Sequence, residues 1–89
     1  MNKKEILKLS YIEKAKKIIH GERNDDYGPM KEQFNKVAIM WSVILDKNIT
    51  AEQVCLCMTA LKLTREAYKH KDDNCIDAIG YLEILGQIR

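Results

Sequence analysis

The sequence lacks several features that particular classes of protein require. Its 89 residues include one proline and four glycines, so there are few places for tight β turns or flexible linkers. The formal net charge is +2 at pH 7, which gives no basic footprint for a nucleic acid polymer. No apolar run approaches the ~20 residues of a membrane span. We therefore expect neither a nucleic acid polymer nor a membrane as partner.

Cysteine and histidine are scarce as well. Cys55, Cys57 and Cys75 are too few, and odd in number, for a disulfide framework, and they indicate thiols in a reducing compartment. Cys55 and Cys57 are two positions apart on an expected helix and point to different faces, while His20 and His70 have no partner at metal-ligand spacing. We predict no metal site and no cofactor. The N-terminus lacks the apolar core of a signal peptide, which favours a cytoplasmic location.

What the sequence does contain is helical periodicity. Residues are 46% hydrophobic and 31% charged, which is typical of a globular chain. Apolar spacing predicts helices over about 3–20, 30–45, 51–69 and 73–89, all within a single domain, 1–89. Gly21 is expected to end the first helix and Pro29 to open the second. Thr50 and Gln53 fit a capping box at the start of the third. The predicted fold class is all-α, a compact bundle of about four helices.

More apolar surface is present than one such bundle can bury. The second helix should present Met30, Phe34, Val37, Trp41 and Ile44 on a single face. The rear of the third helix adds a separate strip, Leu56, Leu63 and Ala67, and the last helix is apolar over most of its circumference. This excess predicts a homo-oligomer.

Charged residues fall where the hairpin of the third and fourth helices should be apolar. One predicted stripe runs through Val54, Cys57, Met58, Leu61 and Tyr68, with Arg65 inside it and Lys62 at its edge. On the last helix, Asp73, Asp77 and Tyr81 recur at i, i+4 and i+8. Because charges are rarely buried without a partner, two interpretations stay open. Either Arg65 pairs with Asp77 and Lys62 with Asp73, or these side chains line a polar pocket.

A second concentration of functional groups lies between the first two helices. Residues 20–29, HGERNDDYGP, include an imidazole, a guanidinium, three acids and a phenol within ten positions. Asn and Asp are common in turns, which explains part of this composition but not the whole set. Arg23, Lys62 and Arg65 suit phosphate, and Tyr27 or Tyr81 suits stacking on a planar ring. Asp73 and Asp77 can accept hydrogen bonds from hydroxyl or amine groups, while His20 and His70 sit at helix ends.

The arrangement of these residues resembles a family of small phage and prophage proteins of uncharacterised function. The similarity rests on His-Gly-x-Arg-x3-Tyr-Gly from His20 and on Lys62-x2-Arg65 followed by His70-x-Asp-Asp-x3-Asp-x2-Gly-Tyr. It covers about residues 18–81. The resemblance implies a viral or prophage origin, a bacterial host cell and an all-helical fold, and it carries no established activity.

The residues and the resemblance together predict binding of a nucleotide-derived small molecule. The site residues would be His20, Arg23, Tyr27, Lys62, Arg65, His70, Asp73, Asp77 and Tyr81, with none of them assigned as catalytic. Such a protein could sequester cyclic nucleotide or ADP-ribose-type immune signals as an anti-defence sponge, by an analogy that does not depend on fold.

Two other functions stay open as alternatives. Helical nucleotide pyrophosphohydrolases of the MazG kind carry Glu-Glu-x-x-Glu on one helix and Glu-x-x-Asp on the next, where they hold Mg²⁺. The general layout here is similar, but Lys62 and Arg65 stand where that plan needs acids, and Asp73 and Asp77 are the candidate ligands left. An adaptor that inhibits a host protein through its apolar strips is the third possibility.

Overall fold

The computed structural model describes residues 2–7, 9–23, 25 and 28–89, and throughout these residues the regular structure is helical. In chain order the elements are α1 (Lys3–Leu7), α2 (Tyr11–Lys17), η1 (Ile18–Glu22), α4 (Met30–Leu45), α5 (Ala51–Tyr68) and α6 (Asp72–Ile88). The prediction of an all-α bundle is confirmed. No helix in the described part of the chain is both long and apolar enough to cross a membrane.

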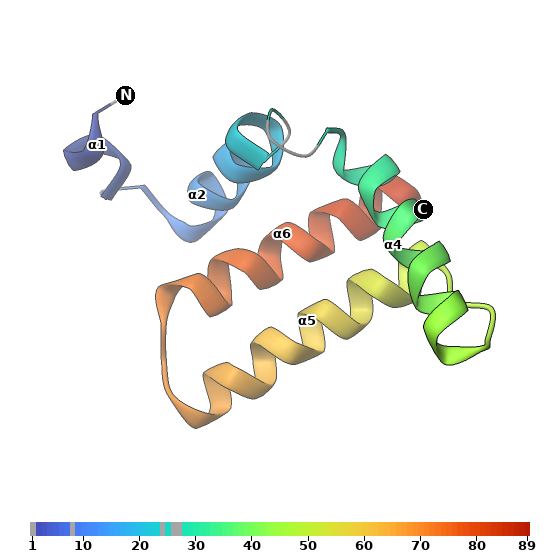
Figure 1. Cartoon of the computed structure of the whole chain (residues 1–89). Coiled ribbons are helices and arrows are strands. Elements are labelled where there is room, and N and C mark those ends of the chain that lie inside the picture. Colours follow the sequence, from blue (N-terminus) through green and yellow to red (C-terminus); the bar gives the residue numbers. More distant parts are fainter. Residues whose placement is uncertain (1, 8, 24, 26–27) are drawn as a thin grey trace.

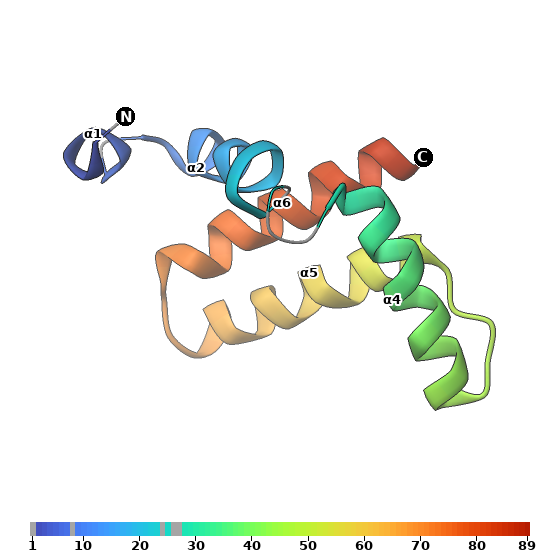
Figure 2. The ribbon, with the colours of Figure 1, turned by 45° about the horizontal axis from the view of Figure 1, so that its top comes forward.

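The helices α5 and α6 form an antiparallel hairpin that α2 and α4 pack against (Figures 1 and 2). The predicted capping box at the start of α5 is present. Thr50 Oγ1 accepts a hydrogen bond from the Gln53 backbone N–H at 3.1 Å, and the Thr50 N–H donates to Gln53 Oε1 at 2.9 Å. The turn of residues 69–71 then leads directly into α6, which begins one residue before the predicted start.

The first predicted helix, over residues 3–20, is interrupted in the structure. Ser10 has an extended backbone, with φ −67° and ψ 165°, and its side chain accepts a hydrogen bond from the Glu13 N–H, so a new helix begins at Tyr11. At the other end, Gly21 does not cap the helix as expected. It lies inside the π-helical turn η1, and Arg23 is the C-cap residue. Figures 1 and 2 show α1 apart from the remaining helices.

The first half of α4 contributes buried side chains to the core, whereas the second half is largely exposed. Gly28 takes a positive φ of 82° just before Pro29, which gives the chain the turn it needs to enter α4. Met30 and Phe34 are buried, but the second half of α4 projects beyond the hairpin (Figure 2). Ile44, expected on the buried face, is 71% exposed. The helix ends at Asp46, which adopts the left-handed conformation with φ 52°.

The buried face of α5 is rotated from the predicted one. Val54 is buried as expected, but Cys57 is exposed and Tyr68 is 93% exposed. At ~100° per residue, the observed buried residues centre some 80° further around the helix. The small residues Ala51, Cys55 and Thr59, spaced at i, i+4 and i+8, form this face, because small side chains let a neighbouring helix approach closely. This rotation turns Lys62 inward and leaves Arg65 exposed, the reverse of the prediction.

Candidate functional site

A cavity of about 190 Å³, partly open to solvent, lies where α2, η1, α4, α5 and α6 meet. Most of its wall is aliphatic, including Ile19, Val54 and Ile84, and the remaining wall is polar or aromatic. Protein cores pack to high density, and voids larger than a water molecule are few. Small-molecule sites are concave and mostly apolar, as this cavity is. It is therefore the first place to look for a bound small molecule.

Asp77, from α6, carries a charged group into the wall of this cavity. Its carboxylate lies 2.8 Å from Lys62 Nζ of α5 and 4.0 Å from a terminal nitrogen of Arg23, which follows η1. The side chains of Asp77 and Lys62 are only 13% and 14% exposed, whereas that of Arg23 is 44% exposed. The carboxylate of Asp77 thus faces two cations. Together the three side chains carry a net charge of +1 at the edge of the cavity.

Two further features of the wall bear on what the cavity can hold. Gln33 Oε1 is buried and has no hydrogen-bond partner among the residues that the structure describes. A buried acceptor without a donor is costly. The rings of Phe34 and Tyr81 lie nearby on the same wall with centroids 5.9 Å apart and planes tilted by 38°. The wall therefore offers aromatic surface together with one unused acceptor.

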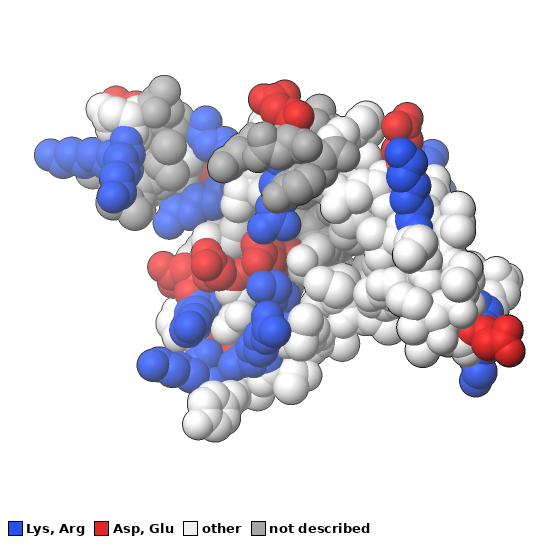
Figure 3. Space-filling model, viewed as in Figure 1, with Lys and Arg blue, Asp and Glu red and all other residues white. Residues whose placement is uncertain are grey.

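An open groove lies on the hairpin beyond the Lys62–Asp77 pair. Lys62, Arg65 and Asp73 line it, together with the exposed ring of Tyr68 and four further polar residues, Thr64, Lys69, Lys71 and Asn74. Figure 3 shows basic side chains gathered over this end of α5, next to the acidic start of α6. Because Lys62 lines the groove and also bonds Asp77 in the cavity wall, it connects the two spaces.

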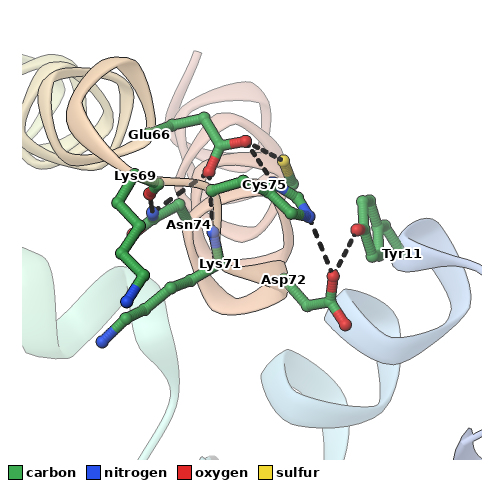
Figure 4. Close-up of polar contacts among 8 residues, drawn as sticks. Tyr11, Glu66, Lys69, Lys71, Asp72, Asn74 and Cys75 are labelled. Atoms are coloured by element: carbon green, nitrogen blue, oxygen red, sulfur yellow. Dashed lines mark hydrogen bonds and ion pairs between the residues drawn. The ribbon is translucent and has the colours of Figure 1, made fainter.

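A separate polar network closes the turn between α5 and α6 (Figure 4). Glu66 Oε1 accepts hydrogen bonds from the Lys71 backbone N–H at 3.0 Å and from Asn74 Nδ2 at 3.2 Å. Glu66 Oε2 bonds His70 Nδ1 and lies 3.8 Å from Cys75 Sγ.

The same network extends from the turn to α2. The other ring nitrogen of His70 is 3.2 Å from Asp72 Oδ1, which also accepts a hydrogen bond of 2.6 Å from Tyr11 Oη. Figure 4 shows Tyr11 reaching Asp72 from α2. These contacts therefore link α2 to the turn between α5 and α6.

These contacts shift the pKa values of the groups that make them. The hydrogen bond from His70 lowers the pKa of Glu66 to about 2, and the same bond raises the pKa of His70. The hydrogen bond to Asp72 raises the pKa of Tyr11 to about 12, while it lowers the pKa of Asp72. Desolvation, followed by the charge of Glu66, raises the pKa of Cys75. These shifts favour ionised carboxylates, a protonated imidazole and neutral hydroxyl and thiol groups in the network.

Comparison with protein families gives a match over residues 10–89 to DUF6378, a domain of unknown function. The chain belongs to this family. The Gene 55 protein of Mycobacterium phage D29 is 36% identical over 73 residues, which cover 81% of this chain and 48% of the relative. The Gene 55 protein of Mycobacterium phage L5 is 30% identical over 83 residues, covering 91% and 53%.

The relatives confirm the expected kinship with phage proteins. The DUF6378 chain spans about half the length of the two Gene 55 proteins. No solved structure matches it. It is a phage-type protein, and neither the family description nor the relatives' names state an activity.

The structure separates the nine residues predicted as one site into several groups. Arg23, Asp77 and Tyr81 line the cavity. Lys62 joins this group through its bond to Asp77, while Arg65 and Asp73 line the groove. His20 lines a second pocket, between α2, η1 and α6, and His70 belongs to the turn network. Tyr27 lies outside the described residues.

The pairing of charges also differs from the simple alternative considered for the hairpin. Asp77 is bonded by Lys62 and Arg23, and among the described residues Arg65 has no ion-pair partner. The inward rotation of α5 explains this, because it brings Lys62 rather than Arg65 to face α6.

Two features of the site were missed by sequence reasoning. Gln33 gave no signal, because a single amide on an amphipathic helix is ordinary. The grouping of Glu66, His70 and Cys75 was missed because histidine and cysteine alone were considered as zinc ligands, while carboxylates were considered only as ligands of Mg²⁺. Had carboxylates been included, Glu66-x3-His70 would have been visible as an i, i+4 pair at the end of a helix.

Proposed function

We propose that this DUF6378 chain is a small-molecule-binding protein whose ligand is nucleotide-derived, with a planar ring and a phosphate group. The ring would occupy the cavity and the phosphate would lie at its edge. We further propose that the protein sequesters its ligand in the cytoplasm of the bacterial host, as a sponge for cyclic nucleotide or ADP-ribose-type immune signals would.

The observation that carries this proposal is the Asp77 group. A core needs no charge for packing, and charged side chains are almost never buried unless paired. A single pair would suffice for a structural role, yet Asp77 faces both Lys62 and Arg23. The additional cation gives the edge of the cavity an excess positive charge. That excess suits an anionic group, and a guanidinium can bind phosphate through two parallel hydrogen bonds.

The cavity itself is consistent with the other half of such a ligand. An apolar cavity of about 150 Å³ takes up benzene, so the 190 Å³ found here has room for one planar ring. Phe34 and Tyr81 supply aromatic surface for it. Gln33 Oε1 accepts no hydrogen bond from the described residues, and an exocyclic amine of a nucleobase would donate one to it. Arg65 and Asp73, in the adjoining groove, would contact the rest of the ligand.

A thermal-shift screen tests the proposal directly. The purified protein would be heated with mononucleotides, cyclic oligonucleotides and ADP-ribose derivatives, with and without Mg²⁺, and the ligand recovered for analysis. Ligand at ~100 times Kd adds roughly 2.7 kcal/mol to the free energy of unfolding. For a domain of this size each kcal/mol raises Tm by about 4–8 °C. We expect a shift of this order and intact ligand after release.

Variants with matched controls locate the site. Lys62→Met should reduce the ligand-induced shift relative to its own unliganded Tm, whereas Lys47→Met, at an exposed position in the α4–α5 loop, should leave it unchanged. Gln33→Met should raise the unliganded Tm, because it removes a buried acceptor without a partner, and should reduce the shift. No shift with any ligand of the panel would sink the proposal. A shift accompanied by a hydrolysed ligand would favour the MazG-like alternative.

We also propose that the chain forms a homo-oligomer through the projecting half of α4. Ile39, Met40, Val43, Ile44 and Leu45 are all more than half exposed on this helix. Residues 37–45, VAIMWSVIL, contain no charged side chain. A second copy of the same surface can therefore pack against it without burying or opposing a charge, as an isologous interface requires. The uncharged surface over α4 is visible in Figure 3.

A further inference from the structure

The hairpin turn between α5 and α6 gathers three side chains that are good ligands for a transition metal. They are Glu66 from the last turn of α5, His70 from the turn itself and Cys75 from the first turns of α6. One carboxylate oxygen, one ring nitrogen and the sulfur all lie within 4.8 Å of one another. A tetrahedral zinc ion with bonds of about 2.0–2.3 Å would separate such atoms by roughly 3.3–3.6 Å. Small side-chain adjustments would therefore be enough to accommodate the ion.

Two of the three ligands, Glu66 and His70, are already oriented by a second contact. Glu66 Oε1 is held by the Lys71 N–H and by Asn74, which leaves Oε2 facing His70 and Cys75. Glu66 is thus fixed by its other oxygen rather than free to rotate. The contacts of Oε1 with the turn therefore leave Oε2 as the oxygen that can bind a metal ion.

The histidine has the outer partner that metal-bound histidines usually have. His70 Nδ1 faces Glu66, while Nε2 lies 3.2 Å from Asp72 Oδ1. Metal-ligating histidines commonly bond a carboxylate through the nitrogen that does not bind the metal, which fixes the ring orientation. Asp72 is itself held by Tyr11 Oη at 2.6 Å. Asp72 therefore holds one ring nitrogen of His70, and the other ring nitrogen faces Glu66, where a metal ion could bind.

The donor set selects the kind of metal. Mg²⁺ and Ca²⁺ prefer sites built from oxygen, and a thiolate is a poor ligand for either ion. One sulfur, one imidazole nitrogen and one carboxylate oxygen suit Zn²⁺, which is borderline soft and often keeps three protein ligands with a fourth position open. The side chains of His70 and Glu66 are 60% and 28% exposed, so an ion can enter from solvent.

We propose that Glu66, His70 and Cys75 form a zinc-binding site that joins α5 to α6 at their turn, with water in the fourth position. The three ligands are separate from the cavity, because none of them lines it, although Lys71 and Asn74, which hold Glu66, also line the adjoining groove. In chemical terms, binding of the ion releases to solvent any proton on His70 Nδ1 and the proton of the Cys75 thiol.

Cobalt(II) is the probe that tests this site. The full chain, reduced with a phosphine rather than a thiol, would be titrated with Co²⁺ and followed by absorption. We expect one ion per chain, with the visible bands of tetrahedral cobalt and the near-ultraviolet band of a thiolate–cobalt bond, and loss of these bands when Zn²⁺ is added. Absence of the thiolate–cobalt band in the folded protein would overturn the proposal.

Matched variants assign the ligands. Cys75→Ser should abolish the thiolate–cobalt band, whereas Cys57→Ser, which changes an exposed cysteine of α5, should retain it. Asp72→Asn should lower zinc affinity by about 10–100-fold without removing the band, because it disturbs an outer partner and not a ligand. Circular dichroism would establish that each variant folds. Glu66→Gln, which keeps every cysteine, provides a second test if Cys75→Ser does not fold. Persistence of the original spectrum in both variants would contradict the assignment.

Discussion

At the scale of single residues, the three cysteines have different environments in one small chain. Cys55 is fully buried in the core, Cys57 is exposed on the opposite side of α5, and Cys75 is half-buried in the turn network. From the sequence, all three were expected to be thiols in a reducing compartment, with Cys55 and Cys57 on different faces of a helix. The structure gives each a distinct reactivity, because accessibility and thiolate formation both control cysteine chemistry.

Burial of Cys55 predicts a loss of stability at alkaline pH. Burial raises the pKa of this thiol to about 11 from an ordinary value of 9.0. The folded chain therefore holds the proton more tightly than the unfolded chain does. The resulting contribution to stability is complete below about pH 9 and is lost as the pH rises towards 11. We expect urea unfolding to show a smaller decline over this range for Cys55→Ala than for the wild type.

The exposed neighbour provides the control for this prediction. Cys57→Ser should decline with pH as the wild type does, so the difference between the two variants isolates Cys55. At pH 8, iodoacetamide should modify Cys57 while Cys55 stays unmodified until the protein is unfolded. An equal alkaline decline in Cys55→Ala and the wild type would show that this thiol does not contribute.

At the scale of elements, sequence patterns located helix ends better than helix faces. The capping box of Thr50 and Gln53 was predicted because it depends on residues within one turn. The break at Ser10 was missed because the apolar spacing of residues 3–20 continues across it. The prediction of the buried face of α5 was wrong. The face that is buried depends on how closely α6 can approach, and the small residues Ala51, Cys55 and Thr59 permit the closest approach.

The capping box makes a quantitative prediction. Thr50→Ala removes the acceptor for the Gln53 N–H and should lower the free energy of unfolding by about 1 kcal/mol. Thr64→Ala is the matched control, because Thr64 lies on the exposed middle of the same helix, where alanine is the better helix former. We expect this change to stabilise the protein by up to about 0.5 kcal/mol. Chemical denaturation of both variants would check the opposite signs, and equal effects would argue against a role for the cap.

At the scale of the whole molecule, the candidate site could be predicted only in part. The sequence identified Arg23, Lys62, Asp77 and Tyr81 as unusual polar residues, and the structure brings these four together around the cavity. It could not separate them from His20 and His70, because the distance between helix ends depends on packing rather than on spacing along the chain. The cavity itself has no signature in the sequence, since it is defined by what the side chains leave unfilled.

The proposed oligomer is also tested at this scale. Size-exclusion chromatography with light scattering should give a mass above that of one 10.3 kDa chain for the wild type. Val43→Glu places a charge in the middle of the α4 surface and should convert the protein to a monomer, because an unpaired charge in an apolar interface is costly. Val43 is 73% exposed, so the folded monomer should tolerate the change.

A matched variant distinguishes the α4 surface from the second apolar strip. Leu63→Glu changes a residue of α5 that is 59% exposed, and it should leave the oligomer intact. If Leu63→Glu dissociates the oligomer and Val43→Glu does not, the interface lies on α5 instead. A monomeric wild type would remove the proposal altogether, and the α4 surface would then be available to a host protein.

The bond between Tyr11 and Asp72 has a consequence for the order in which the molecule assembles. These residues are 61 positions apart, whereas α5 and α6 are joined by a turn of three residues. Contacts between distant segments carry a larger loop-closure cost, so the hairpin can form early and α2 docks on it late. The last element to dock is also the one that opens most easily in the native protein. Because α2 and η1 supply one wall of the cavity, their transient detachment would widen the opening through which a molecule enters it.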